Sequence, residues 1–372
     1  MFSYTSGTTG VPKGVMLSHK MILGSGSGIG FSCSQGNIPG LGPKDSYISY
    51  LPAAHSFEQC LYGCAITLGM KIGMFGGNVL KLTEDAQILK PTLFPSVPRL
   101  YNRIYGKIQD GIKQATGVKA WLVNKAITTK LENFRAGKGL THPIYDALVC
   151  KKFKAILGGQ VRIMVTGSAP MSPDVLDFLK IAFACDLCEG YGMTESSGGS
   201  VCTVPGDNFS GYVGGPVRNC KIRLRDLPEM GYLHTNDPPK GEIMFWGSGI
   251  MKGYFRNPEK TAEAIQEGGW LASGDVGMIL PNGAIKIVDR AKNIFKLSQG
   301  EYIAPEKLEN VYIQSEFLMQ CWIYGDSLRD HCIAFVVLDP DRMARYSKET
   351  GKDAASLPDD EEVRDMVYAS ML

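Results

Sequence analysis

The loop from Thr5 to Val15 reads TSGTTGVPKGV and combines glycines, closely spaced hydroxyls and one lysine. Backbone N–H groups, hydroxyls and an ammonium group are what a protein needs to wrap a polyphosphate. The run is not a Walker A motif, because Gly rather than Ser or Thr follows Lys13. The loop therefore predicts a phosphate clamp of another kind, and the alternative is an ordinary surface turn. The groups that would form the clamp are Thr5, Ser6, Gly7, Thr8, Thr9, Gly10 and Lys13.

A second group of candidate residues lies in GYGMTE, Gly190 to Glu195, which follows an expected parallel strand. Ligands of open α/β sheets bind at the carboxyl ends of the strands. Tyr191 could stack on a base, Thr194 could bond a phosphate oxygen, and Glu195 offers the oxygen ligand that Mg²⁺ prefers. Taken alone, the segment is equally compatible with a turn that carries a solvated glutamate.

Two further candidates lie later in the chain. Asp275, in the glycine-flanked turn GWLASGDVG, could accept both hydroxyls of a ribose, although a turn aspartate often bonds its own backbone. The pair Asp289-Arg290 falls where a hinge between two units is expected. Arg290 could bind ribose or phosphate oxygens, and the alternative is an exposed, charged linker.

The elements that must position these residues change in character along the chain. Strand and helix patterns alternate to about residue 200, which predicts an α/β layered sheet with the motifs at strand ends. From Gly206 to Asp289 the segments are short and β-rich, and PNG at Pro281 to Gly283 predicts a hairpin. A helix and two strands follow, which predicts the start of a compact α+β unit. We therefore expect three parts, at residues 1–205, 206–288 and 289–372.

Composition excludes several classes of protein. The 372 residues carry a formal net charge of +2 without a clustered basic run, which argues against a nucleic-acid partner. Ten scattered cysteines predict reduced thiols, and the CxxC of Cys185 and Cys188 is interpreted as core packing rather than a metal or redox site. The apolar stretch from Leu61 to Leu80 is interrupted by Lys71 and glycines, so it predicts a buried segment rather than a membrane span.

The four motifs, in this order, resemble those of the acyl-adenylate-forming (AMP-binding) ligases. This superfamily includes acyl-CoA synthetases, luciferases and the adenylation domains of peptide synthetases. Within it, YLPAAHSFE, VTGSAPMS and IFKLSQGEYIAPEKLENVY look most like eukaryotic-type long-chain fatty acyl-CoA synthetases. The resemblance implies an AMP-forming long-chain fatty acid–CoA ligase that converts ATP and a fatty acid to an acyl-adenylate and then transfers the acyl group to CoA.

The resemblance also implies roles for single residues. It assigns the opening loop, with Lys13, to the ATP phosphates, Thr194 to the α-phosphate and Glu195 to Mg²⁺. It places His55 beside the acyl carboxylate, although His55 could equally be a local helix cap. It makes Asp289 the hinge of the small domain and Arg290 an assistant to Asp275 at the ribose. The adenine pocket would be lined by Gly167, Ser168, Ala169, Gly190, Tyr191, Gly192 and Met193.

The implied small molecules are ATP, Mg²⁺, the fatty acid and CoA as co-substrate. The implied location is intracellular rather than secreted, in the cytoplasm or peripheral on the endoplasmic reticulum or another organelle membrane. Members of the family are longer, carry a large segment before the opening loop and end in a catalytic lysine motif that this sequence lacks. We therefore expect a fragment truncated at both ends, weakly active or inactive alone. The alternatives are a ligase for another acid class and a non-catalytic nucleotide-binding paralogue.

Overall fold

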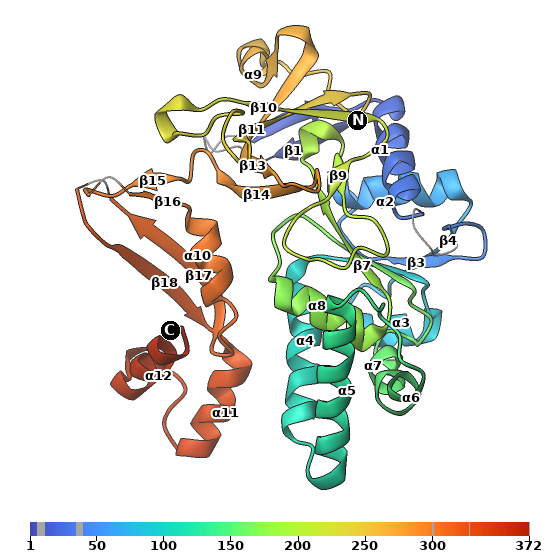
Figure 1. Ribbon diagram of the computed structural model, residues 1–372, viewed down its shortest axis with the longest axis vertical. Helices are drawn as coiled ribbons and strands as arrows, with labels where there is room; N and C mark the ends of the chain where they lie inside the picture. The colour runs from blue at the N-terminus through green and yellow to red at the C-terminus, as the bar shows by residue number, and fades with distance from the viewer. Residues whose placement is uncertain (6–11, 35–39, 300, 327, 372) are drawn as a thin grey trace.

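The structure is a computed structural model that describes residues 1–5, 12–34, 40–299, 301–326 and 328–371. It has a mixed α/β architecture in which a large layered unit, a β-rich sheet and a smaller C-terminal unit follow one another (Figure 1). The α-helices are α1 (His19–Ser32), α2 (Ser56–Leu68), α3 (Leu82–Leu89), α4 (Pro98–Lys113), α5 (Gly117–Arg135), α6 (Pro143–Tyr145), α7 (Lys151–Ala155), α8 (Pro173–Phe183), α9 (Pro258–Ala264), α10 (Pro305–Tyr312), α11 (Pro340–Thr350) and α12 (Glu361–Met371).

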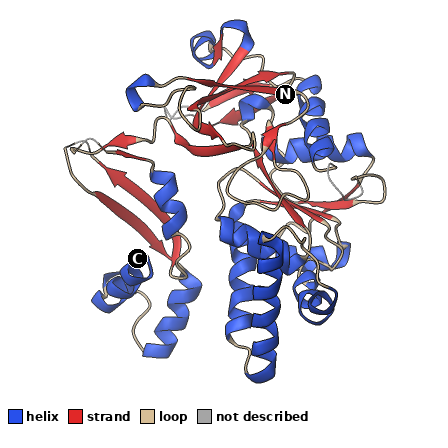
Figure 2. Cartoon of the chain, in the orientation of Figure 1, coloured by secondary structure: helices blue, strands red, loops and turns tan. Residues whose placement is uncertain are grey.

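The largest sheet has seven strands in the order β4-β3-β5-β6-β7-β8-β9. The first five of these run parallel to their neighbours, and β8 and β9 are added antiparallel at one edge. Figure 2 shows this sheet between helices. Its strands are β3 (Ser46–Ser49), β4 (Lys71–Met74), β5 (Leu93–Ser96), β6 (Ile163–Thr166), β7 (Asp186–Tyr191), β8 (Val201–Cys202) and β9 (Gly215–Pro216).

The central strands are covered on both faces, which explains their continuous apolar sequences. Alternate residues of β6 point to opposite sides of the sheet. Ile163 and Val165 pack in the cluster that contains residues of α1 and α2. Met164 packs in the opposite cluster, with residues of α3, α4 and α8. The parallel sheet is therefore the middle layer of three, as the alternation of strands and helices predicts.

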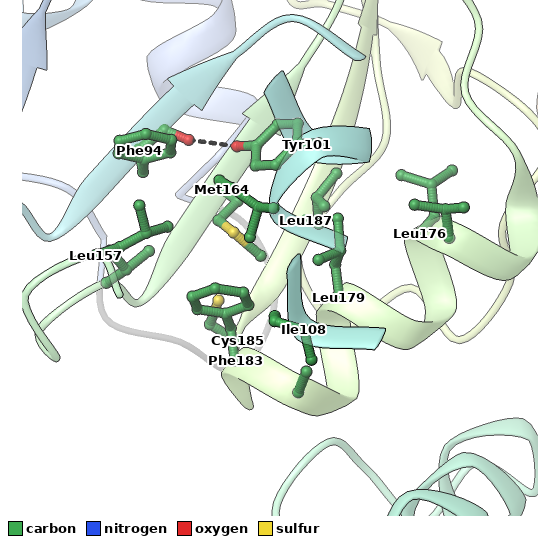
Figure 3. Packing of buried hydrophobic residues seen from close by; sticks show 14 of the residues in the cluster. Phe94, Tyr101, Ile108, Leu157, Met164, Leu176, Leu179, Phe183, Cys185 and Leu187 are labelled. Carbon is green, nitrogen blue, oxygen red and sulfur yellow. Dashed lines mark hydrogen bonds between the residues drawn. The ribbon is translucent and has the colours of Figure 1, made fainter. Parts of the chain in front are cut away.

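The second of these clusters forms the main core (Figure 3). Phe94 and Tyr101 are fully buried, and the Tyr101 hydroxyl donates a hydrogen bond of 2.6 Å to the Phe94 carbonyl. That bond satisfies a polar atom that would otherwise be costly to bury. Leu179 of α8 and Met164 of β6 belong to the same cluster, and their side chains are also fully buried, at 0% exposure. The strand β5 is thereby fixed to the start of α4.

The β-rich region forms a five-stranded antiparallel sheet, as the sequence predicts. The predicted hairpin at Pro281 to Gly283 is confirmed: it joins β13 to β14, and Gly283 has a φ of 80°. A separate antiparallel pair, β1–β2, begins the chain. These strands are β1 (Phe2–Thr5), β2 (Lys13–Met16), β10 (Cys220–Arg225), β11 (Lys240–Gly247), β12 (Ile265–Gln266), β13 (Trp270–Ile279) and β14 (Ile285–Arg290).

The C-terminal unit packs α10 against the antiparallel pair β17–β18 and adds α11 and α12. Its contacts with the large unit include exposed ion pairs to α4, from Glu316 to Lys113 at 3.4 Å and from Arg345 to Asp110 at 3.0 Å. The remaining strands are β15 (Phe295–Lys296), β16 (Tyr302–Ile303), β17 (Leu318–Gly325) and β18 (Cys332–Leu338). The short helices are η1 (Val79–Lys81), η2 (Asp146–Cys150), η3 (Thr194–Ser196), η4 (Pro228–Met230), η5 (Glu267–Gly269) and η6 (Leu357–Asp359).

The prediction of a buried segment from Leu61 to Leu80 is confirmed only in part. The stretch forms most of α2 and then the strand β4, but Ile66, Met74, Val79 and Leu80 are exposed, and β4, which carries Met74, is the edge strand of its sheet. Among the described residues, none of the helices combines the length and apolar character needed to span a bilayer. Cys185 and Cys188 are buried free thiols, in line with the interpretation as core packing. Ser172 occupies the N-cap of α8, but its hydroxyl makes no capping bond.

Candidate active site

The strands β1 and β2, which precede and follow the opening loop in the chain, pair antiparallel. Thr5 and Lys13 are paired directly across the two strands, so both ends of the loop are fixed by strand pairing. The Thr5 hydroxyl is buried and has no hydrogen-bond partner among the described residues, an arrangement that a ligand oxygen could complete. The predicted clamp residues Ser6, Gly7, Thr8, Thr9 and Gly10 lie outside the described residues.

Lys13 and Glu195 are brought together by Tyr254, a residue that sequence reasoning missed. The Lys13 ammonium lies 4.5 Å from the centre of the Tyr254 ring. The Tyr254 hydroxyl donates a hydrogen bond of 2.7 Å to Glu195 Oε1, and the Glu195 side chain is buried. Burial, and then the charge of Glu195, raise the pKa of Tyr254 far above its ordinary value, so the hydroxyl remains a donor.

Backbone pairing explains how Tyr254 reaches this position. The segment from Met251 to Phe255 lies along β2, with bonds from Met16 N to Gly253 O and from Phe255 N to Gly14 O. Met251 N also donates to the carbonyl of Glu195 at 2.8 Å, which ties the second motif to the same segment. An apolar GYF in sequence gives no sign of a site. The flanking Asn257-Pro258 signals only a turn and the N-cap of α9, so the sequence contains no local signal for this residue.

A cavity of about 250 Å³ opens beside Pro12 and Lys13, at the end of the opening loop. Three of its lining side chains are cationic, Lys13, Arg256 and Lys260, and one of these, Lys260, is also paired with Glu263. A cavity of this size with excess positive charge favours an anionic ligand. Arg256 and Lys260 are further residues that sequence reasoning missed, because nothing in the sequence distinguishes this turn arginine and this α9 lysine from ordinary solvated cations. The other lining residues are Tyr4, Pro12, Gly14, Phe255 and Asn257.

Tyr191 and Asp275 also lie together, as their predicted roles at one nucleoside require. The Tyr191 hydroxyl donates to Asp275 Oδ2 at 2.6 Å. Asp275 is paired with Arg290 across β13 and β14, and the Arg290 Nε lies 3.7 Å from Asp275 Oδ1. Burial raises the pKa of Asp275, while the Tyr191 hydroxyl and the Arg290 charge oppose that shift. The carboxylate is thus oriented from two sides before any ligand arrives.

The loops after β6 and β7 lie against each other. A Cβ added to Gly167 would lie 3.1 Å from the carbonyl oxygen of Gly190, so the two backbones approach closely. A Cβ on Gly192 would lie 1.9 Å from the carbonyl oxygen of Gly198, which makes glycine necessary there. Ser168 and Ala169 are exposed beside Gly167, and Met193 and Thr194 are half-buried at the start of η3. The structure therefore brings the predicted adenine-pocket loops to one edge of the sheet.

Asp289 has a clear structural role. Its carboxylate is fully buried and accepts hydrogen bonds from Arg290 N at 2.6 Å and from Glu306 N at 3.0 Å. The second bond caps the N-terminus of α10 and so links β14 to the C-terminal unit. The Arg290 guanidinium also lies 3.8 Å from Glu306 Oε1. Burial, and then the nearby charge of Asp289, raise the pKa of Glu306 to about 7.

For His55 the sequence allowed two roles, a local helix cap or a group beside the acyl carboxylate. It is the N-cap of α2, and its Nδ1 accepts a hydrogen bond of 3.2 Å from Phe57 N. The imidazole is exposed, and its Nε2 makes no hydrogen bond to another of the described residues. The cap is therefore observed, and a role beside an acyl carboxylate stays a prediction.

Comparison with known proteins assigns the family. A family model described as AMP-binding enzyme matches residues 1–255. The chain belongs to the AMP-binding enzyme family. Among curated members, it is 45% identical over 353 residues to the peroxisomal long chain acyl-CoA synthetase 6 of Arabidopsis thaliana, covering 94% of this chain and 49% of that protein. It is also 45% identical over 348 residues to long-chain-fatty-acid–CoA ligase 5 of Rattus norvegicus, covering 94% and 50%.

Solved members of the family share the fold. The adenylation domain of the carboxylic acid reductase from Segniliparus rugosus, in complex with AMP and a co-purified carboxylic acid, aligns with a TM-score of 0.75 at 28% identity. That alignment covers 100% of this chain and 52% of the other. The corresponding domain from Mycobacterium chelonae gives a TM-score of 0.76 at 25% identity, covering 99% and 51%. The chain thus spans about half the length of the curated relatives it matches.

Proposed function

We propose that this chain carries the nucleotide-activating part of a long-chain fatty acid–CoA ligase of the AMP-forming type. The observation that carries the proposal is the series of contacts from Lys13 through Tyr254 to Glu195 beside the cationic cavity. The names of the acyl-CoA synthetases and ligases that match 94% of the chain support a fatty acid as the activated carboxylate.

The proposed reaction has two displacements. A fatty acid carboxylate oxygen attacks the α-phosphorus of ATP, forming the acyl–phosphate bond as pyrophosphate leaves. The CoA thiol then attacks the acyl carbonyl carbon, the thiol proton is lost, and AMP leaves. Negative charge accumulates on phosphate oxygens in the first step, so fixed cations and N–H donors are the groups that would lower its barrier. Lys13 and the opening loop are assigned that task.

The nucleoside is assigned to the second group of residues. Asp275, held by Tyr191 and Arg290, would accept the ribose hydroxyls, and the Tyr191 ring and the loop from Gly167 to Ala169 would border the adenine. Thr194 would bond the α-phosphate. We further propose the division at residues 205 and 288, with Asp289 as the hinge about which the C-terminal unit turns to admit CoA. His55 is assigned to the acyl carboxylate.

The residues present fit a magnesium ion that is held mainly by its nucleotide. Among the described residues, no group of three or more His, Cys, Asp or Glu side chains could form a metal cage. Mg²⁺ usually binds through one or two carboxylates together with substrate phosphates. Glu195, whose Oε1 is fixed by Tyr254, would supply such a carboxylate. The ion would neutralise charge on the phosphate oxygens when bound.

The proposal also covers location and partners. It takes ATP, a fatty acid and CoA as small-molecule partners. It places the protein inside the cell, in the cytoplasm or at the surface of an organelle membrane. The similarity to a synthetase named as peroxisomal supports an intracellular site.

Fatty-acid-dependent ATP–pyrophosphate exchange tests the proposal on the 372-residue chain. We expect exchange that needs both hexadecanoate and Mg²⁺, at a rate below that of full-length family members, and that falls in Asp275→Ala. The matched control is Asp365→Ala, at an exposed helical carboxylate. Absence of ATP binding would contradict the assignment of the site, and ATP binding without any exchange would restrict the function of this chain alone to nucleotide binding.

A further inference from the structure

The hairpin of α4 and α5 projects from the large unit. In Figure 1 the two helices run side by side, and the turn between them reaches the lower end of the molecule. Residues 114–116 form this turn, between the end of α4 at Lys113 and the start of α5 at Gly117. The tip of the hairpin, residues 113–125, is therefore convex and accessible.

Large apolar side chains lie exposed at this tip. Val118 is 80% exposed and Trp121 is 66% exposed. They are three residues apart on α5 and so lie on the same face. Another side of α5 faces the body of the protein and carries its buried residues, Ala126, Lys130 and Phe134. Val118 and Trp121 thus contribute nothing to the core, and their exposure calls for another explanation.

The same tip carries a local excess of positive charge. Residues 113–125 contain three lysines and no Asp or Glu, whereas the chain as a whole has 39 basic and 37 acidic residues. Lys113 is paired with Glu316. Lys119 and Lys125 are exposed, and neither is in an ion pair with another described residue. Lys125 lies one helical turn from Trp121, on the same face.

We propose that the tip of the α4–α5 hairpin docks on an anionic phospholipid bilayer. Trp121 and Val118 would enter the interfacial layer, where an indole ring is favourable, and Lys119 and Lys125 would contact lipid phosphates. A convex apolar tip flanked by two exposed lysines fits a deformable planar surface. An acidic protein partner would need a groove complementary to this convex tip, whereas a bilayer does not. The inference identifies a surface beyond the proposed function and does not depend on the activity.

Vesicle co-sedimentation of the 372-residue chain tests the proposal. The probes are vesicles of phosphatidylcholine alone and of phosphatidylcholine mixed with phosphatidylserine. We expect binding to the mixed vesicles that weakens with added salt, and little binding to the neutral ones. The double variant Lys119→Glu/Lys125→Glu should bind the mixed vesicles roughly tenfold more weakly or worse. Trp121→Ala should bind severalfold more weakly.

Matched controls separate the tip from the rest of the surface. Trp322→Ala removes another tryptophan, 55% exposed on β17, and Lys20→Glu/Lys71→Glu reverses two other exposed lysines. Both controls should bind like the unmodified chain. The proposal is overturned if the unmodified chain does not bind the mixed vesicles. It is also overturned if the tip variants bind as well as the controls do, since another surface would then be responsible. Because all substituted side chains are exposed, equal melting temperatures should verify that each variant is folded.

Discussion

At the scale of single residues, the site depends on contacts that link distant parts of the chain. Glu195 would be an isolated buried carboxylate without the hydroxyl of Tyr254, which lies 59 positions later. Asp275 is oriented by Tyr191, 84 positions earlier. In both pairs a tyrosine donates to a carboxylate that is assigned to the ligand. Tyr254 is therefore a positioning residue, whereas Tyr191 both orients Asp275 and is assigned to border the adenine.

Substitution of Tyr254 by Phe tests the first pair. The change keeps the ring beneath Lys13 and removes the donor to Glu195. We expect the stability to fall by about 1–3 kcal/mol, because a buried acceptor loses its partner. Urea unfolding followed by circular dichroism measures the change. Tyr4→Phe, at a side chain that is 67% exposed, is the control and should have no effect. An unchanged midpoint for Tyr254→Phe would show that the bond to Glu195 is not formed.

The pH dependence of stability tests the cluster around Arg290. Burial and the charge of Asp289 raise the pKa of Glu306 from 4.5 to about 7. Since the folded protein holds this proton more tightly than the unfolded chain, the contribution of Glu306 to stability is present below the unfolded pKa and is lost as the pH rises towards about 7. We expect the midpoint of unfolding to fall between pH about 5 and about 7 more steeply in the unmodified chain than in Glu306→Gln. Parallel curves for the two proteins would contradict this explanation.

At the scale of elements, the sequence predicts most strands and helices because their apolar patterns have a clear period. The buried run of β6 and the PNG turn between β13 and β14 both carry strong local signals. No local signal in the sequence predicts that the segment from Met251 to Phe255 lies along β2, because this position depends on pairing between residues about 240 positions apart. The sequence likewise places Asp289 at a boundary but does not reveal that its carboxylate caps α10. Tertiary contacts of this kind produce no periodic pattern in the sequence.

The glycine loop after β7 gives a prediction at this scale. Gly192→Ala would place a Cβ 1.9 Å from the carbonyl oxygen of Gly198, so the loop must move. We expect a loss of stability and weaker binding of ATP. Gly111→Ala, within α4 and with open space around the new Cβ, is the matched control and should be neutral or stabilising by roughly 0.5–1 kcal/mol. Equal behaviour of the two variants in calorimetric titration would refute the close approach.

At the scale of the whole molecule, the C-terminal unit is attached through few and mostly exposed contacts. The ion pairs Lys113–Glu316 and Arg345–Asp110 are open to solvent, and such pairs contribute little. The buried bond from Glu306 N to Asp289 lies at the junction itself. This distribution is what a hinge at Asp289 would require, because the outer contacts can break at small cost.

A double variant tests this distribution. Asp110→Asn with Lys113→Gln removes both ion pairs and leaves the pair of Glu316 with Arg342 in place. It should lower the stability by no more than about 1 kcal/mol. Hydrogen exchange should increase in α11 and around Glu316, and it should stay unchanged in β13 and β14. Faster exchange throughout the five-stranded sheet would instead indicate that the ion pairs hold the whole molecule together.

The central claim is that this chain binds an activated fatty acid through its nucleoside and phosphate. Calorimetric titration with a non-hydrolysable hexadecanoyl-adenylate analogue tests it most directly, because binding needs no turnover. We predict saturable binding by the 372-residue chain that is weakened roughly tenfold or more in Asp275→Ala and is unchanged in Asp365→Ala. Absence of binding, or equal affinity in all three proteins, would contradict the account.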